Sequence, residues 1–361
     1  MMYHRNNSKG VNCGSVPIGG GAPISIQSMT NTDTRDVQAT LRQIGELEEA
    51  GCQIIRCAIP DMEAAQAFGE IKKRCTLPMV ADIHFDYRLA VAAIKNGADK
   101  VRINPGNIGD TERIRAVVAA AKEHQIPIRV GVNAGSLEKD ILKKYQGVTA
   151  EGIVESALQN IQTLEEMDFE DMVVSVKASD VVLSYESHLL LAEKIPYPIH
   201  VGITEAGTAD SGKVKSAIGI GAILLAGIGD TMRVSLTGNP VNEVLFAKEI
   251  LKSLKLTKGG IHFVSCPTCG RCTVDLETMA RRVEGELQSI EKERDSLGLK
   301  PLTVAVMGCE VNGPGEAKSA DIGVACGRGK GVIFKQGIIL ETVKEEEIVA
   351  RLLRYIREET L

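Results

Sequence analysis

The sequence contains no tryptophan, and aromatic residues make up only 3% of its 361 residues. It also has no excess of positive charge, because 42 lysines and arginines are outnumbered by 47 aspartates and glutamates, which gives a net charge of −5. Proteins that bind nucleic acids normally present a basic surface, and those that bind single strands also need aromatic rings for base stacking. Binding to nucleic acid is therefore not expected.

The sequence also lacks long apolar runs. Residues 1–15 have no apolar core like that of a signal peptide, and no uncharged stretch elsewhere is long enough to span a bilayer. We therefore expect a cytoplasmic protein without a membrane partner. With 44% hydrophobic residues the chain can bury extensive apolar surface, and its length predicts two domains rather than one.

Nine cysteines are an odd number, and no export signal accompanies them, which favours thiols, metal ligands or redox chemistry over a set of disulfides. The first four stand among apolar or loop residues and are expected to be small buried hydrophobic side chains. These are Cys13, Cys52, Cys57 and Cys75. The other five lie in the C-terminal third of the chain, as Cys266, Cys269, Cys272, Cys309 and Cys326.

From about Pro23 to Ser253, short β-branched segments alternate with longer segments of helical character. This alternation is typical of a parallel sheet built from strand-then-helix units. Eight such units over roughly 250 residues predict an α/β fold, a (β/α)8 TIM barrel. The expected strands begin at Ile24, Ile54, Met79, Lys100, Ile128, Met172, Ile199 and Met232.

The pattern changes after Leu254, where LKLTKGG (254–260) ends in a glycine pair that is typical of a linker. Beyond it we expect a strand at 261–265, a charged helix from about Asp275 to Arg294, four short strands and a final amphipathic helix at about 344–358. The predicted organisation is a TIM-barrel substrate-binding domain at 1–255 and a smaller α+β domain at 256–361.

Polar residues recur at alternate positions near the C-terminal ends of the expected barrel strands. Alternate strand positions share a face, and the active sites of such barrels lie at the C-terminal mouth. Five cations would converge there and form a site for phosphate groups. The alternative is a set of ion-paired core residues, although buried unpaired cations are costly without a ligand. The cations are Arg56, Arg102, Arg129, Lys177 and Arg233, and their polar neighbours are Asp82, His84, Asn104, Asn133, Ser175 and Ser235.

Glu205 lies in GITEAG, just after the seventh expected strand. It is the best-placed single carboxylate for proton transfer. Capping of the following helix is an equally good role for it on sequence alone.

Two overlapping C-x2-C pairs occur in SCPTCGRC (265–272), and Cys309 follows within MGCEVNGPGE (307–316). Clustered thiolates at this spacing bind either Zn²⁺ or an iron–sulfur cluster. A zinc ribbon normally repeats C-x2-C in both halves, whereas the second half here offers one cysteine in a Gly-Pro-rich loop. An iron–sulfur cluster is therefore favoured over zinc.

Further motifs lie in order along the chain: QSMTNT (from Gln27), ADIHFD (Ala81), VRINPGNIG (Val101), RVGVNAGSL (Arg129), VKASDV (Val176), GITEAGT (Gly202) and RVSLTG (Arg233). Together with SCPTCGR and GCEVNGPGE, they resemble the bacterial 4-hydroxy-3-methylbut-2-enyl diphosphate synthase family (IspG/GcpE) of the non-mevalonate isoprenoid pathway. The resemblance covers essentially the whole chain, and shared barrel ancestry does not explain motifs of this length in both domains.

The resemblance implies that residues 256–361 form a 4Fe-4S cluster domain. Its cluster would be held by Cys266, Cys269 and Cys309, with Glu316 on the fourth iron. An oxygen ligand binds that iron more weakly than a thiolate and can give way to a substrate oxygen. Cys272 departs from the family pattern, and as a fourth sulfur ligand it would close the cluster and suit it to electron transfer alone. We expect Glu316 to be the ligand, and Cys272 and Cys326 to be free thiols.

The reaction that the resemblance implies is the reductive ring opening and dehydration of 2-C-methyl-D-erythritol 2,4-cyclodiphosphate. Reduced flavodoxin or ferredoxin would deliver the two electrons singly through the cluster. The five barrel cations would hold the diphosphate, Glu205 and Asp82 would handle protons, and the remaining orienting contacts would come from Asn104, Asn133 and Ser235.

A short linker does not readily let one chain place its cluster on its own barrel mouth. The resemblance therefore also implies a head-to-tail homodimer, in which each barrel is capped by the cluster domain of the other chain. Two other interpretations remain open. One is a zinc-stabilised barrel that binds a pterin or another phosphorylated small molecule without redox chemistry, and the other is a pure electron carrier.

Overall fold

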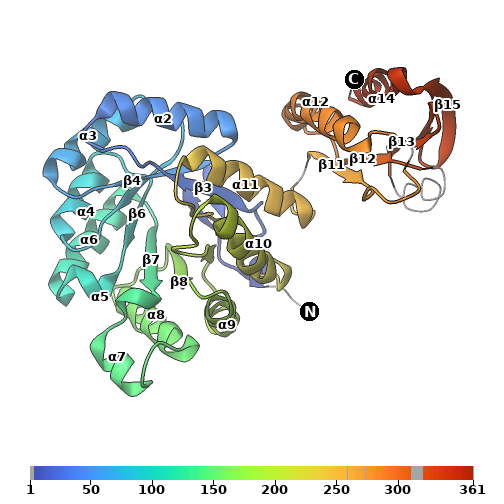
Figure 1. Ribbon diagram of the computed structural model, residues 1–361. Coiled ribbons are helices and arrows are strands. Elements are labelled where there is room, and N and C mark those ends of the chain that lie inside the picture. The colour runs from blue at the N-terminus through green and yellow to red at the C-terminus, as the bar shows by residue number, and fades with distance from the viewer. Residues whose placement is uncertain (1–3, 258, 273, 310–319, 361) are drawn as a thin grey trace. The chain divides into compact units, whose positions relative to one another are not determined.

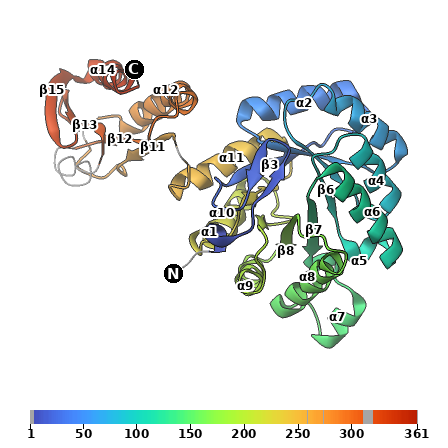
Figure 2. The same cartoon turned by 180° about the vertical axis from the view of Figure 1, so that it is seen from behind.

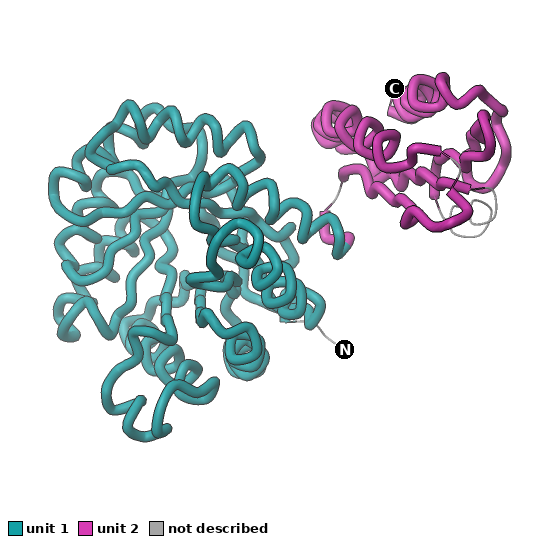
Figure 3. The backbone as a smooth tube through the Cα atoms, viewed as in Figure 1, with its two compact units in different colours: residues 1–254 teal, residues 255–361 magenta. Residues whose placement is uncertain are grey.

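The computed structural model describes residues 4–257, 259–272, 274–309 and 320–360. The chain divides into two compact units, residues 1–254 and 255–361, which Figure 3 draws in different colours. Each unit has its own sheet and its own helices. No helix in the described part of the chain is both long enough and apolar enough to cross a membrane.

The first unit is a parallel barrel, which confirms the predicted fold. Its strands pair in the order β8-β7-β6-β5-β4-β3-β10-β9, and a bridge between Val174 and Ile199 joins the two ends of this series. The strands are β3 (Ser25–Met29), β4 (Ile54–Ala58), β5 (Met79–Asp82), β6 (Lys100–Ile103), β7 (Ile128–Asn133), β8 (Met172–Lys177), β9 (His200–Val201) and β10 (Thr231–Met232).

Helices follow the strands and surround the barrel, as Figures 1 and 2 show from opposite sides. The main ones are α2 (Val37–Ala50), α3 (Met62–Lys72), α4 (Tyr87–Lys95), α6 (Thr111–His124), α8 (Ala150–Glu165), α9 (Val181–Ala192), α10 (Ala209–Leu225) and α11 (Pro240–Ser253). Shorter helices are α1 (His4–Asn7), α5 (Pro105–Ile108) and α7 (Lys139–Lys144), with a 3-10 turn at Ala134–Ser136.

Aspartates define where many of these helices begin. An aspartate at the N-cap accepts a hydrogen bond from a backbone N–H of the first turn, which satisfies a donor that has no partner within the helix. This arrangement starts α2, α3, α4, α6 and α9, through Asp36, Asp61, Asp86, Asp110 and Asp180. The helix starts are therefore fixed locally, and each falls shortly after the strand before it.

A hairpin that the sequence pattern did not predict closes the N-terminal end of the barrel. Its antiparallel strands are β1 (Val11–Cys13) and β2 (Val16–Ile18). The hairpin packs against the first residues of three barrel strands through one buried cluster, formed by Val11, Cys13, Ile18, Ile54, Val80 and Val173. The opposite, C-terminal end of the barrel carries the polar side chains discussed below.

The second unit has a mixed five-stranded sheet in the order β11-β12-β13-β14-β15. β11, β12 and β13 run parallel, and β14 and β15 are antiparallel to their neighbours. Two helices cover one face of the sheet and enclose a core that includes Val283, Val304 and Leu352. The elements are β11 (Ile261–Ser265), α12 (Leu276–Ser296), β12 (Leu302–Met307), β13 (Ile322–Gly327), β14 (Lys330–Lys335), β15 (Ile338–Lys344), a 3-10 turn at Glu345–Glu347 and α14 (Ile348–Glu358).

Candidate functional site

Of the five cations singled out from the sequence, Arg102, Lys177 and Arg233 lie at or near the C-terminal ends of barrel strands. Arg56 lies in the middle of β4, and Arg129, expected near the end of its strand, is instead the second residue of β7. Arg56, Arg102, Arg129 and Lys177 are on β4, β6, β7 and β8, and Arg233 directly follows β10. Arg129 is 1% exposed, although it has one of the largest side chains in the barrel. Inward-facing positions on neighbouring strands thus bring these charges together in the barrel mouth.

Asp82, at the end of β5, is the carboxylate among these cations. One oxygen, Oδ1, lies 3.4 Å from Arg102 Nη1, and Oδ2 lies 3.8 Å from Arg56 Nε and 3.5 Å from His84 Nε2. Burial acts to raise the pKa of Asp82, but Arg56, His84 and Arg102 outweigh it and hold the pKa below its usual value. Asp82 is therefore ionised at neutral pH and well placed to orient two of the arginines.

A second carboxylate, Glu243, is one that the sequence reasoning missed. It is a buried residue of α11 whose Oε2 lies 3.2 Å from Arg233 Nη2, and its Oε1 accepts a hydrogen bond from the Leu236 N–H. It lies in the first turn of α11, outside the strands, so the alternation of the barrel strands gave no signal for it. Among the described residues, two carboxylates, Asp82 and Glu243, form ion pairs with these five cations, which leaves a positive excess suited to a multivalent anion.

Two of the cations have nitrogen atoms left over for such an anion. Arg129 donates through Nη1 to Ser175 Oγ at 3.2 Å, while its Nε and Nη2 have no hydrogen-bond partner among the described residues. Burial lowers the pKa of Lys177 well below its usual value, and Arg129 and Arg56 lower it further. Lys177 would regain a normal pKa only with negative charge beside it.

Two glycines on the barrel strands make room for these side chains. A methyl group added to Gly131 of β7 would lie 2.8 Å from Arg102 Nε. One added to Gly202, just after β9, would lie 2.8 Å from Lys177 Nζ and 2.6 Å from the Arg233 carbonyl oxygen. The cations can occupy the mouth because these strands carry no side chain at the two positions.

A deeper polar layer, also missed in the sequence analysis, lies below the cations. Lys100 precedes Arg102 by two residues on β6 and shares its inward face, so the alternation that identified Arg102 could also have identified Lys100. Lys100 Nζ, both ring nitrogens of His200 and both polar atoms of Gln27 are buried without a hydrogen-bond partner in the described part of the chain. Buried polar atoms of this kind normally bind ordered water or a ligand.

The remaining predicted barrel residues occupy loops at the same end. Asn104 is buried and caps α5, accepting from the Gly106 N–H through Oδ1 at 3.2 Å, so that its amide N–H donors remain available. Asn133 ends β7 and Ser235 follows β10, and both are half-buried. The side chains of all three therefore lie on segments that border the cations.

Glu205 is exposed and has a backbone φ of +51°, a left-handed conformation that is strained for a residue with a side chain. The N-cap of α10 is Thr208, so Glu205 does not take the capping position that was its alternative role. Strained residues of this kind gather at functional sites, where the surrounding structure holds them.

The cysteines of the second unit emerge at one edge of its sheet. β11 and β12 are parallel neighbours, with Ser265 paired to Val306. Cys266 follows β11 directly and Cys309 comes two residues after β12, so both lie where these strands end. Cys269 is exposed in the loop after Cys266.

The described residues do not contain a preformed group of three metal-ligating side chains, and Glu316 lies outside them. The chemistry of the donor set still fits a metal cluster, because soft sulfur ligands follow the adjacent ends of β11 and β12, and Cys269 is exposed in the same loop as Cys266. Cys326 is buried on β13, and burial, followed by the nearby Cys272 and Glu345, raises its pKa to about 12. It therefore stays a neutral thiol.

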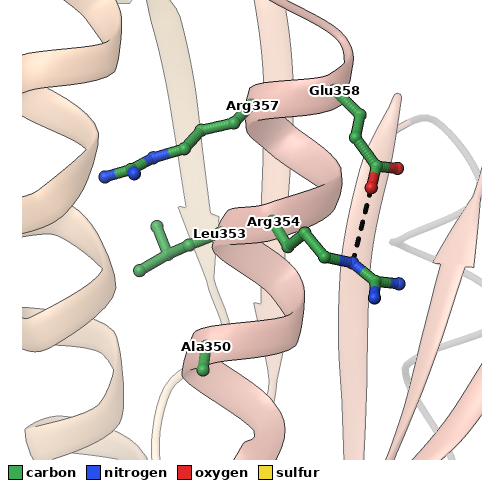
Figure 4. A pocket seen from close by; sticks show the side chains of 5 residues that line it. All are labelled: Ala350, Leu353, Arg354, Arg357 and Glu358. Atoms are coloured by element: carbon green, nitrogen blue, oxygen red, sulfur yellow. Dashed lines mark ion pairs between the residues drawn. The ribbon is translucent and has the colours of Figure 1, made fainter.

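A surface pocket of about 430 Å³ lies along α14, where it is lined by Ala350, Leu353, Arg354, Arg357 and Glu358 (Figure 4). None of the residues predicted from the sequence lines it. Arg354 Nε lies 3.4 Å from Glu358 Oε1, so these two exposed charges neutralise each other. Arg357 is then the one cation left in its lining, against five in the barrel mouth, and no cysteine lines the pocket.

Two family models match this chain. The GcpE TIM-barrel domain matches residues 8–248, and the GcpE protein C-terminal domain matches residues 262–358.

Curated relatives are similar over nearly the full length. Proteins named 4-hydroxy-3-methylbut-2-en-1-yl diphosphate synthase (flavodoxin) include one from Ruminiclostridium cellulolyticum, 56% identical over 354 residues that cover 98% of each chain. Another, from Caldanaerobacter subterraneus, is 56% identical over 99% of this chain and 98% of its own, and one from Geobacter sulfurreducens is 54% identical over 95% of both.

Similar solved structures include the dihydropteroate synthase of Yersinia pestis in complex with a pterine-sulfa conjugate. It has a TM-score of 0.52 and 11% identity, and the match covers 69% of this chain and all of that one. The same enzyme from Stenotrophomonas maltophilia has a TM-score of 0.51 and 13% identity, over 69% of this chain and 97% of its own. At this identity the likeness concerns the barrel fold alone, and it gives no support to a pterin ligand.

The space at Gly131 leads to a first prediction. In a Gly131→Ala variant the added methyl group should displace the Arg102 guanidinium from the mouth. Affinity for inorganic diphosphate, measured by titration calorimetry, should fall roughly tenfold, or ~1.4 kcal/mol. Gly45→Ala in α2 is the matched control, because its methyl meets no atom within 4 Å. Equal affinity in the two variants would mean that Arg102 does not contact the anion.

Proposed function

The chain belongs to the GcpE family, and on this basis we propose that it converts 2-C-methyl-D-erythritol 2,4-cyclodiphosphate to 4-hydroxy-3-methylbut-2-enyl diphosphate by reductive ring opening and dehydration. The observation that carries the proposal is the match of both units to the two domains of this family, with 56% identity to a curated synthase over 98% of the chain. The protein is then an oxidoreductase of isoprenoid biosynthesis.

The barrel mouth is the proposed substrate site. Arg56, Arg102, Arg129, Lys177 and Arg233 hold the diphosphate. The positive excess there supports this role, since a diphosphate supplies the negative charge that the two carboxylates do not. The amide of Asn104 is free to donate to the substrate, and Asn133 and Ser235 orient it from the neighbouring loops.

We divide the roles of the two predicted proton-handling carboxylates. Asp82 is held ionised by two arginines, which makes it a weak proton donor and a good positioning group. Glu205 is exposed at the mouth in a strained conformation and is the better proton donor to the leaving oxygen. Loss of water requires such a donor, because hydroxide is a poor leaving group.

The second unit is the proposed cluster domain, with Cys266, Cys269, Cys309 and Glu316 as ligands of a 4Fe-4S cluster. When bound, such a cluster would supply the electrons of the reduction one at a time. Support comes from the two parallel strands that bring Cys266 and Cys309 to the same sheet edge. The names of the relatives point to flavodoxin as the electron donor, and ferredoxin is the second candidate.

Neither alternative interpretation gains support. A zinc-stabilised pterin-binding barrel would be expected to resemble pterin-binding enzymes in sequence, whereas the dihydropteroate synthases share only 11–13% identity with this chain. A pure electron carrier has no use for five cations in a barrel mouth, three of which, Arg102, Arg129 and Lys177, are buried.

The family's head-to-tail homodimer is also proposed for this chain. An exposed apolar stripe on α10 supports self-association. Val214, Ile218 and Leu225 are 60%, 58% and 68% exposed, and their spacing places them on one face of the helix. Apolar side chains gathered in this way mark protein interfaces more often than free surface.

The direct test of the function uses protein purified without oxygen. We expect about four iron and four acid-labile sulfide per chain, and product formation from the cyclodiphosphate with reduced flavodoxin. Arg129→Ala should keep the iron and sulfide but raise KM. Zinc without sulfide would overturn the redox function, and an unchanged KM in the variant would remove Arg129 from the substrate site.

A second prediction concerns protons. The pKa of Lys177 is lowered in the free protein by burial and by neighbouring cations, and a bound anion should raise it again. At a pH between the pKa of Lys177 in the free protein and its higher pKa in the complex, substrate binding takes up a proton. Affinity for the substrate should therefore fall as the pH rises above the pKa of the free protein. Calorimetry in buffers of different ionisation enthalpy measures this uptake, and Lys177→Gln should abolish it. Equal uptake by the variant would assign the proton to another group.

A third prediction concerns the stripe on α10. Ile218→Glu should place charge in the apolar interface and convert the dimer to a monomer in light scattering after gel filtration. Leu245→Glu is the control, because Leu245 is also exposed but lies on α11. Loss of the dimer in both variants, or in neither, would contradict an interface through α10.

A further inference from the structure

Cys272 is not one of the proposed cluster ligands, yet it contacts both loops that carry those ligands. A methyl group added to Gly308 would lie 2.7 Å from Cys272 Sγ, so the sulfur is packed directly against the Gly308 backbone. The Cys272 thiol donates to the Val274 carbonyl oxygen at 3.3 Å, and its backbone N–H donates to the Cys269 carbonyl oxygen at 2.9 Å. Cys272 therefore connects the turn at Cys269 to the residue that precedes Cys309.

Gly308 in turn contacts one of the proposed ligands. Its backbone N–H donates to Cys266 Sγ at 3.2 Å. Hydrogen bonds to the sulfurs of an iron–sulfur cluster stabilise the more negative, reduced form and so raise the reduction potential. The Gly308 amide is thus positioned to tune the site electronically, provided that the Gly308 backbone is held in place.

The packing around Gly308 fixes that backbone. The Cys272 sulfur and Leu276 Cδ2 together close the space beside Gly308, since they would lie 2.7 Å and 3.0 Å from an added methyl group. Leu276 is buried in the core of the second unit, and the half-buried Cys272 packs against the same core. A side chain removed from position 272 would leave a gap into which Gly308 could move.

We propose that Cys272 is a positioning residue for the cluster, which holds the Gly308 N–H on the sulfur of Cys266 without binding metal itself. The inference rests on the proposed cluster at Cys266, Cys269 and Cys309. The contacts of Cys272 argue against its role as a fourth sulfur ligand, because its sulfur packs on the Gly308 backbone and is directed to the Val274 carbonyl oxygen at 3.3 Å.

The test is a double-mutant cycle on the holoenzyme, read as the midpoint reduction potential from a titration followed by electron paramagnetic resonance. Cys272→Ala and Gly308→Ala should each retain full iron and sulfide but lower the potential, by about 59 mV for a tenfold loss in the reduction equilibrium constant. In the double variant the loss should be smaller than the sum, because alanine at 272 makes room for the methyl group at 308.

Two further variants control for fold and for thiol removal. Cys272→Ser should restore the wild-type potential, because a hydroxyl group of similar size can still donate to Val274. Cys326→Ala removes a buried thiol from the same core, where it contacts Met279 at 3.8 Å, and should leave the potential unchanged.

A wild-type potential in Cys272→Ala would overturn the proposal. So would a three-iron spectrum in that variant, which would make Cys272 a ligand. Should Cys272→Ala fail to hold a cluster, Cys272→Ser decides, since full iron with the wild-type spectrum and potential supports positioning and an altered spectrum refutes it. Absence of iron and sulfide from the wild-type protein is a separate result, which refutes the proposed function itself.

Discussion

The barrel is organised around the burial of more positive charge than its own carboxylates can balance. Asp82 links Arg56 and Arg102, and Glu243 binds Arg233, but Arg129 and Lys177 have no carboxylate of their own within the described mouth. Removing charges from water is costly unless they are paired, and unpaired buried cations destabilise a fold. The empty mouth therefore carries an electrostatic cost, which a bound anion lowers. Gly131, Gly202 and the inward-facing strand positions provide the space in which the cations can gather.

One geometric rule places the functional residues of both units. The carboxyl ends of parallel strands lie at the same end of a barrel or the same edge of a sheet, so residues just beyond them meet although they are distant in sequence. The rule gathers Arg102, Lys177 and Arg233 in the barrel, where Arg56 and Arg129 join them from earlier positions on β4 and β7. It likewise gathers Cys266 and Cys309 from β11 and β12. The connection between those two strands runs through α12, which packs on the sheet and separates the two cysteine loops in sequence by more than thirty residues.

The sequence predicted what depends on local periodicity. Strands such as β4 and β8 begin at the residue expected, because β-branched residues and alternation mark them. The hairpin of β1 and β2 was not predicted, because strands of three residues are too short to show an alternating pattern of apolar and polar residues. Glu243 could not be found either, since a carboxylate on a helix looks like solvated surface until the helix is packed. The role of Gly131 and Gly202 could not be predicted either, because it depends on the Arg102 and Lys177 side chains that pack against them in the folded barrel. Lys100, by contrast, follows the same alternation as Arg102 and was predictable.

The charge imbalance also links ligand binding to the stability of the barrel. Whatever binds the folded mouth and not the unfolded chain stabilises the fold, by about 2.7 kcal/mol at a ligand concentration one hundred times Kd. In the free protein no anion compensates the positive charge. Burial instead lowers the pKa of Lys177 and of Lys100 in the deeper polar layer, and a neutral amine costs less to bury than an ammonium group. The lysines can therefore adjust their charge to the state of the site, whereas the arginines cannot. A mouth built of arginine alone would be harder to fold empty, and one built of lysine alone would give up its positive field when empty. The mixture keeps both the fold and the attraction for the anion.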